Sequence, residues 1–428
     1  MGSLFVFALL FLILVAIAVP VAFALGGATM VMFLVSEHSL ELFAQRLWTG
    51  LDKFTLVAIP FFILAGELMS GSGILNRLLE FARLIVGRVK GGLLYINILV
   101  SMLFGGINGS AVADTSAIGS LLIKATSKEY DDPDLAAAVT ACSSIVGPLI
   151  PPSLPMLIYA FAAANVSVAG LFLAGIVPGV AVGIALMGVT WNICRKRNFP
   201  LDSRRYTTRE VGRILLRFMT AAVLPLIMVA GIVGGIVTPT EAGCVGIVYA
   251  LLVGFFVTRE LTFNAVYAAM ARTVMVTAIV LLLVSVANTS TWWLTIEGVP
   301  NLLSDGVTSM TSNPAVFLFL MVLLYLFIGM FIEQAAAMIM LVPVFAPLAA
   351  RYDVDPIHFG LVTCLSLALG LVTPPVGLCL FVASGIAGSP IQRVFHVSIP
   401  YVVATAFVLL IVTFIPDSFL WLPRLFGF

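Results

Sequence analysis

Residues 105–153 begin with GGINGSAVADTSAIG and end with GPLIPPS, and residues 328–376 repeat this plan with IGMFIEQAAAMIM and GLVTPPV. At a fixed offset of 223 without gaps, Gly106 aligns with Gly329, Gly147 with Gly370, and Pro151-Pro152 with Pro374-Pro375. Ten of the 47 positions from Gly106 to Pro152 are identical, and they include the Gly and Pro residues that interrupt a helix. Backbone-breaking residues in register indicate an internal repeat.

Composition places the chain in a membrane. It is 61% hydrophobic and only 10% charged, whereas soluble domains carry about 25% charged residues. Apolar runs of roughly 20 residues, such as Phe218–Val237 and Val274–Trp293, predict membrane-spanning helices and not the short alternating strands of a barrel. The fold class is therefore an all-α polytopic membrane protein. The net charge of +1 gives no reason to expect a nucleic-acid partner.

The few chemically reactive residues exclude several classes of protein. Five cysteines have no CxxC pairing and three histidines are dispersed, so we expect buried free thiols and neither a metal centre nor a haem. No GxxxxGK[ST] motif is present, so the chain is not expected to hydrolyse ATP. A membrane subunit of a redox or proton-pumping enzyme would need paired histidines, clustered cysteines or a string of buried ionisable groups, which the sequence lacks. A channel would not need two proline-broken helices.

The chain divides into two repeated halves. We expect scaffold helices over 1–90, a first transport unit over 91–194, a basic cytoplasmic linker over 195–217, a second set of scaffold helices over 218–314 and a second transport unit over 315–428. The apolar run Leu4–Val35 is too long for one upright helix. Pro20 and Gly26-Gly27 allow either a kinked, tilted helix or a tight pair of spans, and the sequence does not decide between them.

Each transport unit is predicted to contain a hairpin and a broken helix. The hairpins are expected at 91–127 and 315–350, and the broken helices at 135–164 and 359–386. In the first hairpin, Leu93–Phe104 has 12 residues and would rise about 18 Å, against a hydrocarbon core of about 30 Å. A second short helix is expected over Ala111–Lys124. Neither limb crosses alone at these lengths, which predicts a re-entrant hairpin with a polar tip.

Loop charge predicts the orientation of the repeats. The segment Arg195–Arg217 is the most basic part of the chain, and the positive-inside rule places it in the cytoplasm. Counting spans from there puts the mouth of the first hairpin inside and that of the second outside. The same plan inserted in opposite directions is an inverted-topology repeat, which is typical of secondary transporters.

The broken helices suggest how ions could bind. Pro151 and Pro374 lack the N–H that would bond the carbonyls of Gly147 and Gly370, and Pro152 and Pro375 do the same for Pro148 and Leu371. Free carbonyls at membrane depth need protein, water or an ion as a partner. Two sites lined by neutral oxygens suit Na⁺, and the helix N-termini after each hairpin tip favour an anionic substrate between the tips.

The motif set resembles one transporter family over nearly the whole chain. GGINGSAVADTSAIG, GPLIPPS, TPTEAG, FIEQAAAMIMLVPV and GLVTPPVGLCLFVASGIAG, with IPFFILAGELM near the start and WLPRL near the end, are similar to the large membrane subunit of the tripartite ATP-independent periplasmic (TRAP) transporters. The resemblance implies a multi-pass protein of the bacterial inner membrane that is not an enzyme. It implies two protein partners, a small four-helix membrane subunit (Q-type) and a periplasmic substrate-binding protein (P-type).

The same resemblance implies an activity and a mechanism. Members import an organic acid, of the sialic acid or C4-dicarboxylate type, by Na⁺ symport with an elevator motion of the domain that carries the hairpins. The sequence does not name the acid. A self-sufficient Na⁺/carboxylate symporter of the same fold is the alternative.

Site residues follow from the resemblance position by position. The first Na⁺ site would use Gly105, Asn108, Ser110, Gly147, Ile150 and Pro151, and the second Gly329, Gly370, Thr373 and Val376. Candidate substrate-binding residues are Ser110, Asp114, Thr115, Ser153, Glu333 and Thr373. Asp114, Glu241 and Glu333 could instead be helix N-caps or first-turn acids, and Thr238–Glu241 fits a helix start.

Overall fold

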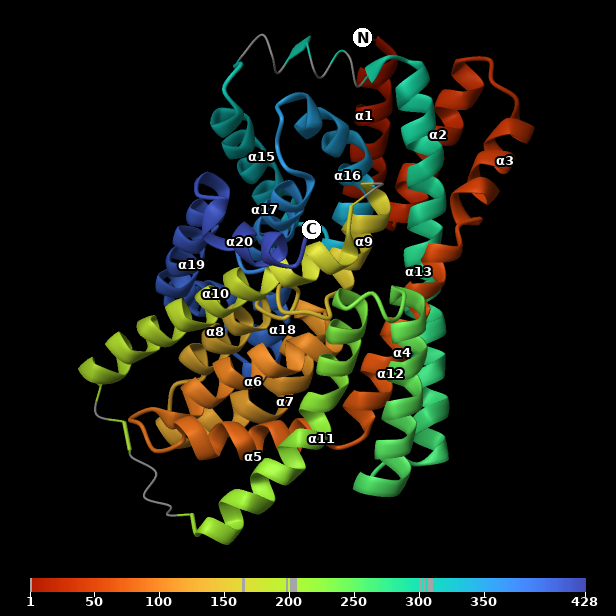
Figure 1. The fold of residues 1–428 in the computed structure, drawn as a ribbon. Coiled ribbons are helices and arrows are strands. Elements are labelled where there is room, and N and C mark those ends of the chain that lie inside the picture. The colour runs from red at the N-terminus through yellow and green to blue at the C-terminus, as the bar shows by residue number, and fades with distance from the viewer. Residues whose placement is uncertain are drawn as a thin grey trace.

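The protein is built from helices. The computed structural model describes residues 2–163, 166–197, 199–200, 206–299, 302, 305–306 and 311–428, and all the regular elements in these ranges are helical (Figure 1). Within them, seven helical segments are long and apolar enough to cross a membrane: Phe54–Gly71, Val168–Lys196, Thr208–Val233, Pro239–Thr258, Phe263–Ile296, Gln334–Arg351 and Ile391–Phe414. These segments confirm the prediction of an all-helical, multi-span protein.

The apolar N-terminal stretch is a tight pair of helices. α1 (Gly2–Ala16) and α2 (Val21–Val35) are joined by a turn at Ala18, where φ is +64°, and they pack against each other. Each has 15 residues and therefore rises about 22 Å, less than the thickness of the hydrocarbon core. The structure thus selects the pair over the single kinked helix. The short amphipathic helix α3 (Leu40–Leu51) follows.

A second group of helices surrounds α13 (Phe263–Ile296), the longest helix described. It contacts α2 and α3 towards one end and packs against α4 (Ala58–Gly71), which follows the short helix η1 (Phe54–Val57) (Figure 1). α4 also packs on α12 (Pro239–Leu252), which continues as a π-helix, η2 (Val253–Thr258), while α5 (Ile74–Val86) packs on α11 (Thr208–Val233). The assignment of these helices to a static scaffold concerns motion and stays a prediction.

Each repeat contains a helical hairpin opposite an interrupted helix. In the first, α6 (Gly92–Asn108) and α7 (Ala111–Tyr130) form the hairpin, and α8 (Pro133–Ser144) and α9 (Leu154–Ala162) flank the break. In the second, α15 (Pro314–Gly329) and α16 (Gln334–Arg351) form the hairpin, and α17 (Pro356–Gly370) and α18 (Leu378–Ala387) flank the break. The Pro151-Pro152 and Pro374-Pro375 peptide bonds are both cis.

The limbs of the first hairpin are longer than the sequence suggested. α6 has 17 residues and α7 has 20, so they rise about 26 Å and 30 Å. α6 therefore remains shorter than the hydrocarbon core, as predicted, whereas α7 matches it in length, so the prediction that the second limb is too short was wrong. Gly105 and Gly106 continue α6 as helix, whereas the sequence reading ended the limb at Phe104, and α7 runs past Lys124 to Tyr130. What distinguishes the hairpin is the location of its tip beside the break in the helix that follows.

The two repeats are interlocked. α18 of the second broken helix packs against α7 and α8 of the first repeat, and α9 of the first broken helix packs against α16 of the second. α10 (Val168–Lys196) and α19 (Ile391–Phe414) pack on each other, and α19 also contacts α8. The terminal helix α20 (Asp417–Leu425) lies on α10. Each interrupted helix therefore lies partly within the other repeat.

The junction between the repeats is described only in part. The basic end of α10 carries Arg195 and Lys196, and α11 begins after Thr207, which forms a capping box with Glu210. Arg204 and Arg205 of the predicted linker fall at 201–205, outside the described residues. Four of the five cysteines are buried free thiols as predicted, whereas Cys244 is exposed.

Candidate functional site

The first hairpin touches the first broken helix backbone to backbone. A Cβ added to Gly105 would lie 2.1 Å from the Cα of Gly147, and a Cβ added to Gly147 would lie 2.9 Å from the Cα of Gly105. Real Cβ atoms do not approach other atoms this closely, so only glycine fits at either position. Gly106 is less restricted, since its Cβ would lie 3.1 Å from the carbonyl oxygen of Pro151 and 3.4 Å from Ile150. Four of the predicted first-site residues are thus brought together: Gly105, Gly147, Ile150 and Pro151.

The second hairpin meets the second break in the same way. A Cβ on Gly329 would lie 2.6 Å from the carbonyl oxygen of Leu367, and one on Gly370 would lie 2.6 Å from the Cα of Gly329. The tip is also joined to the break by a hydrogen bond, in which the Gly377 N–H donates to the Met330 carbonyl at 3.1 Å. Two of the predicted second-site residues, Gly329 and Gly370, are therefore in direct contact.

The structural repeat differs from the sequence register by one residue. The offset of 223 pairs Gly329 with Gly106, but Gly105 makes the equivalent backbone contact. From Gly105 to Ser110, the cap of α7, there is one residue more than from Gly329 to Glu333, the cap of α16. Gly109 lies in this stretch with φ of +66°, a left-handed conformation that favours glycine. The first tip therefore contains one extra residue.

Side chains at the tips and breaks cap the helices that start there. The Ser110 hydroxyl accepts from the Ala113 N–H at 3.4 Å, and the Ser153 hydroxyl accepts from the Met156 N–H at 3.3 Å. The Glu333 carboxylate accepts from the N–H groups of Ala335 and Ala336 at 2.9 and 3.3 Å. These bonds show that Glu333 is an N-cap, and Glu241 is a first-turn acid that forms a capping box with the N-cap Thr238.

Most of the carbonyls predicted to be free are hydrogen-bonded. Gly370 accepts from the Thr373 N–H at 3.0 Å and Leu371 from the Cys379 N–H at 3.0 Å, while Pro148 accepts from the Ser153 hydroxyl at 2.5 Å. The prediction of four free carbonyls was therefore wrong for three of them. Backbone N–H groups of the turn and the Ser153 hydroxyl replace the helical donors that the prolines remove. For the Gly147 carbonyl, no donor is found among the described residues. A carbonyl has a second lone pair, so all four oxygens keep some capacity to bind a cation.

Asp114 is the most unusual polar residue near the first tip. It is fully buried, and neither carboxylate oxygen has a hydrogen-bond partner by distance and angle among the described residues. It lies in the first turn of α7, next to Thr115, whose hydroxyl donates to the Ser144 hydroxyl at 2.6 Å and to the Ala111 carbonyl at 2.9 Å. The Ser101 hydroxyl of α6 is close enough to act on the carboxylate. A buried carboxylate with so few donors is expensive unless a cation or proton accompanies it.

One residue that sequence reasoning did not select links the two half-sites. Cys379 of α18 lies beside Thr115 and Ser144 and within electrostatic range of both Asp114 and Glu333. The acids of the two hairpins are therefore both near this helix. Cys379 could not be selected from the sequence, because the signal is the packing of α18 on the other repeat.

Several predicted residues are less central. Thr373 directs its hydroxyl to the Leu369 carbonyl at 2.8 Å, within its own helix turn. Val376 is partly buried beside Gly377. Asn108 ends α6, but its side chain lies outside the described part of the structure. No cluster of three or more His, Cys, Asp or Glu that could hold a metal is found among the described residues. The donor set is backbone carbonyls, hydroxyls and one buried carboxylate, which are hard oxygens of the kind that bind alkali cations.

The sequence and the fold match known proteins. Residues 8–418 match the profile of the family described as "Tripartite ATP-independent periplasmic transporter, DctM component". The chain is 38% identical to the sialic acid TRAP transporter large permease protein SiaM of Vibrio cholerae over 95% of both chains. It is 35% identical to the C4-dicarboxylate TRAP transporter large permease protein DctM of Pseudomonas aeruginosa, over 94% of this chain and 93% of the relative.

Solved structures support the fold alone. The YdaH transporter of Alcanivorax borkumensis superposes with a TM-score of 0.65 at 17% identity, covering 90% of each chain. MtrF of Neisseria gonorrhoeae gives a TM-score of 0.56 at 13% identity, covering 87% of this chain and 83% of that one.

Proposed function

Because this chain belongs to the DctM component family of tripartite ATP-independent periplasmic transporters, we propose that it imports an organic acid by Na⁺ symport through an elevator motion. It is a permease and not an enzyme, and it is a multi-pass protein of the bacterial inner membrane. The observation that carries the proposal is the pair of glycine contacts, Gly105 with Gly147 and Gly329 with Gly370, by which each hairpin tip lies on a helix break.

The substrate class is supported by the relatives. Their names give sialic acid, C4-dicarboxylate, 2,3-diketo-L-gulonate and isethionate as the transported compounds. All are small organic anions. In this chain, the N-termini of α7, α9 and α16 start at the tips and breaks, and helix N-termini favour anions. Sialic acid and a C4-dicarboxylate are the first acids to test.

Two coupling sites are proposed, with different ligands. The first would hold Na⁺ between the Gly147 carbonyl, the tip residues Gly105, Asn108 and Ser110, and the break residues Ile150 and Pro151. Asp114 would supply a nearby negative charge. The second would use Gly329, Gly370, Thr373 and Val376, mostly through backbone oxygens. Substrate would bind between the tips, near Ser110, Thr115, Ser153 and Glu333.

The elevator motion is supported by the interlocked packing. The hairpins and broken helices of both repeats contact one another through α18 on α7 and α9 on α16, so they can move as one body. The opposite orientation of the repeats rests on loop charge: Arg195 and Lys196 end α10 at the face where Arg209 and Arg213 begin α11. We assign this face to the cytoplasm.

Two partners complete the system. The family is defined by a periplasmic component and a small membrane component, and we propose that this chain works with a separate P-type and a four-helix Q-type protein. Two longer relatives support the Q-type partner, because this chain spans only 69% of SiaT of Haemophilus influenzae and 64% of a permease named DctMQ. The remaining length of these relatives leaves room for a fused small subunit, as the name DctMQ suggests.

Transport in liposomes tests the proposal. The purified chain and its small membrane subunit are reconstituted, and uptake of radiolabelled N-acetylneuraminate and succinate is measured with an inward Na⁺ or K⁺ gradient, with and without the binding protein. We expect uptake of one acid only with Na⁺ and the binding protein. Equal uptake in K⁺ would contradict Na⁺ coupling, and equal uptake without the binding protein would favour the self-sufficient symporter.

A further inference from the structure

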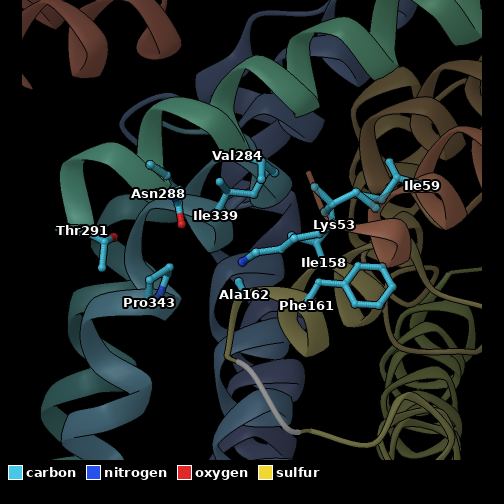
Figure 2. A pocket seen from close by; sticks show the side chains of 12 residues that line it. Lys53, Ile59, Ile158, Phe161, Ala162, Val284, Asn288, Thr291, Ile339 and Pro343 are labelled. Atoms are coloured by element: carbon cyan, nitrogen blue, oxygen red, sulfur yellow. The ribbon is translucent and has the colours of Figure 1, made fainter. Parts of the chain in front are cut away.

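A separate cavity, lined by one basic residue, Lys53, lies between the helices around α13 and the helices α9 and α16, which start at the candidate site. It encloses about 100 Å³. Lys53, Asn288 and Thr291 are its polar lining residues, and the remainder are apolar side chains and Pro343 (Figure 2). Figure 2 shows the Lys53 side chain extending into the ring of lining residues, with its ammonium group directed towards Ala162 and Asn288.

The cavity is close to the tips and breaks along two helices. Ile158 lines it from α9, five residues after the cap Ser153, and Ile339 lines it from α16, six residues after the cap Glu333. At 1.5 Å per residue, these separations are roughly 8 Å and 9 Å along the helix axes. The cavity therefore lies about one and a half turns beyond the candidate site, on two limbs that belong to different repeats.

The location along α13 indicates the side of the membrane. Asn288 and Thr291 lie in the last three turns of this helix, which ends at Ile296 and Glu297, whereas Arg272 lies near its other end and pairs with Glu67 at 2.7 Å. With the basic face in the cytoplasm, the cavity is in the outer half of the protein. An acid arriving from the periplasm would pass it before it reaches the tips.

The Lys53 ammonium is available for an anion. None of the ion pairs found among the described residues includes it, and Lys53 is exposed. Asn288 contributes an amide that donates to the Arg46 carbonyl at 3.4 Å and has a second N–H. In a cavity with apolar walls, a charge pair is stronger than in bulk water, so one ammonium and two polar side chains can hold a carboxylate.

We propose that this cavity is an entry site for the transported anion, in which Lys53 binds the substrate carboxylate and Asn288 and Thr291 donate hydrogen bonds to it. The inference rests on the proposed function. Binding here is weak and precedes binding between the tips. Because Ile158 and Ile339 belong to the limbs proposed to move, the site exists only while those limbs face the outer half of α13.

Charge-selective thiol labelling tests the site directly. In a Cys244→Ser background, which removes the exposed cysteine, Ala162→Cys places a thiol on the cavity wall. Its labelling rates with anionic 2-sulfonatoethyl and cationic 2-(trimethylammonium)ethyl methanethiosulfonate are compared. We expect Lys53→Gln to lower the anionic-to-cationic rate ratio by about tenfold, and Lys53→Arg to preserve it. Lys124→Gln, the same charge change on exposed α7 surface, is the matched control. Val284→Cys provides a second position if Ala162→Cys does not fold.

Protection by ligand completes the test. Succinate and N-acetylneuraminate, used as probes on the detergent-purified chain, should slow the labelling of Ala162→Cys. Lys53→Gln should raise by about tenfold the concentration of the more protective acid that is needed for half-maximal protection. Protection that is equal in Lys53→Gln, or produced only by phosphatidylglycerol, would overturn the proposal. The same assay in Gly105→Ala separates the two claims, since protection should persist there although transport is lost. If no acid is transported by the native chain while Lys53-dependent protection remains, the proposed function fails and the cavity site stands.

Discussion

The two half-sites have the same backbone and different polar groups. In both, a glycine in the hairpin touches a glycine at the break, Gly105 with Gly147 and Gly329 with Gly370. The second half is hydrogen-bonded within itself: Met330 accepts from Gly377, and Gly370 accepts from Thr373. The first half contains the buried Asp114, whose carboxylate oxygens have no hydrogen-bond partner by distance and angle among the described residues. The duplication therefore preserves the docking of tip on break, and the proposal predicts tighter cation binding in the first half.

The largest expected effect tests whether the backbone contact is equivalent in the two halves. Gly105→Ala and Gly370→Ala each place a Cβ where backbone atoms lie, at 2.1 and 2.6 Å. We expect uptake to fall by about 100-fold or more in both variants, because misplacement by about 1 Å is enough for such a loss. Uptake in liposomes, with size-exclusion chromatography to confirm folding, is the measurement.

Two glycines serve as controls for that experiment. Gly106→Ala meets its nearest atom at 3.1 Å, and Gly188→Ala meets none within 4 Å. The first should keep partial activity and the second should be unaffected. Full transport by either Gly105→Ala or Gly370→Ala would show that the corresponding tip does not need its glycine contact.

The next effect addresses the charge that distinguishes the first half. Asp114→Asn keeps the shape of the side chain and removes its charge. If Asp114 balances a cation in the first half-site, the Na⁺ concentration for half-maximal uptake should rise by about tenfold, with a smaller change in the KM for the acid. Na⁺ titration of uptake at saturating acid measures this. An unchanged Na⁺ dependence would remove Asp114 from ion binding and leave the two halves electrostatically alike.

A smaller effect compares the caps of the two hairpin tips. Ser110→Ala and Glu333→Ala each remove an N-cap, which typically costs about 1 kcal/mol of stability. Glu333 accepts two N–H bonds and Ser110 accepts one, so thermal unfolding in detergent should show the larger loss for Glu333→Ala. Glu333→Gln separates the capping role from the charge. It should be more stable than Glu333→Ala, because the amide oxygen can still accept the two N–H bonds. Loss of transport in this folded variant would assign the carboxylate to substrate or ion binding.

The smallest effect concerns Thr373. Thr373→Val removes the bond to the Leu369 carbonyl, worth about 1 kcal/mol, and Thr373→Ser retains it. Because the Gly370 carbonyl still accepts from the Thr373 N–H and the Leu369 carbonyl from the Val372 N–H, we expect less than a threefold change in Na⁺ affinity for Thr373→Val. A change as large as that of Asp114→Asn would place the main ion ligands in the second half, contrary to the comparison above.

Sequence reasoning located the repeat because Gly and Pro report directly on backbone geometry. It found the hairpins and the breaks without coordinates, and the family resemblance supplied the four contact residues of the first half. It misjudged the limb lengths, since glycines at 105 and 106 look like a helix end although the neighbouring break accommodates them within α6. It also missed the one-residue shift between the tips, because an ungapped alignment cannot show where Gly109 adds a residue.

Other features could not be derived from the chain in order. The choice between a kinked helix and a pair for Leu4–Val35 depends on a left-handed turn at Ala18, a residue with no preference for it. The role of Cys379 depends on which helix of the other repeat it meets, and Lys53 resembles an ordinary loop lysine until α9 and α16 are placed opposite it. These features depend on tertiary packing, which the periodicity of a local sequence does not reveal.

The interlocking of α18 with α7 and of α9 with α16 has a consequence for each repeat taken alone. A single repeat alone would leave its last short helix without a hairpin to cover it. A half-length chain of this kind would bury that surface by exchanging it with a second copy, as in a domain-swapped dimer. The present chain has the arrangement of such a dimer with its two halves joined end to end.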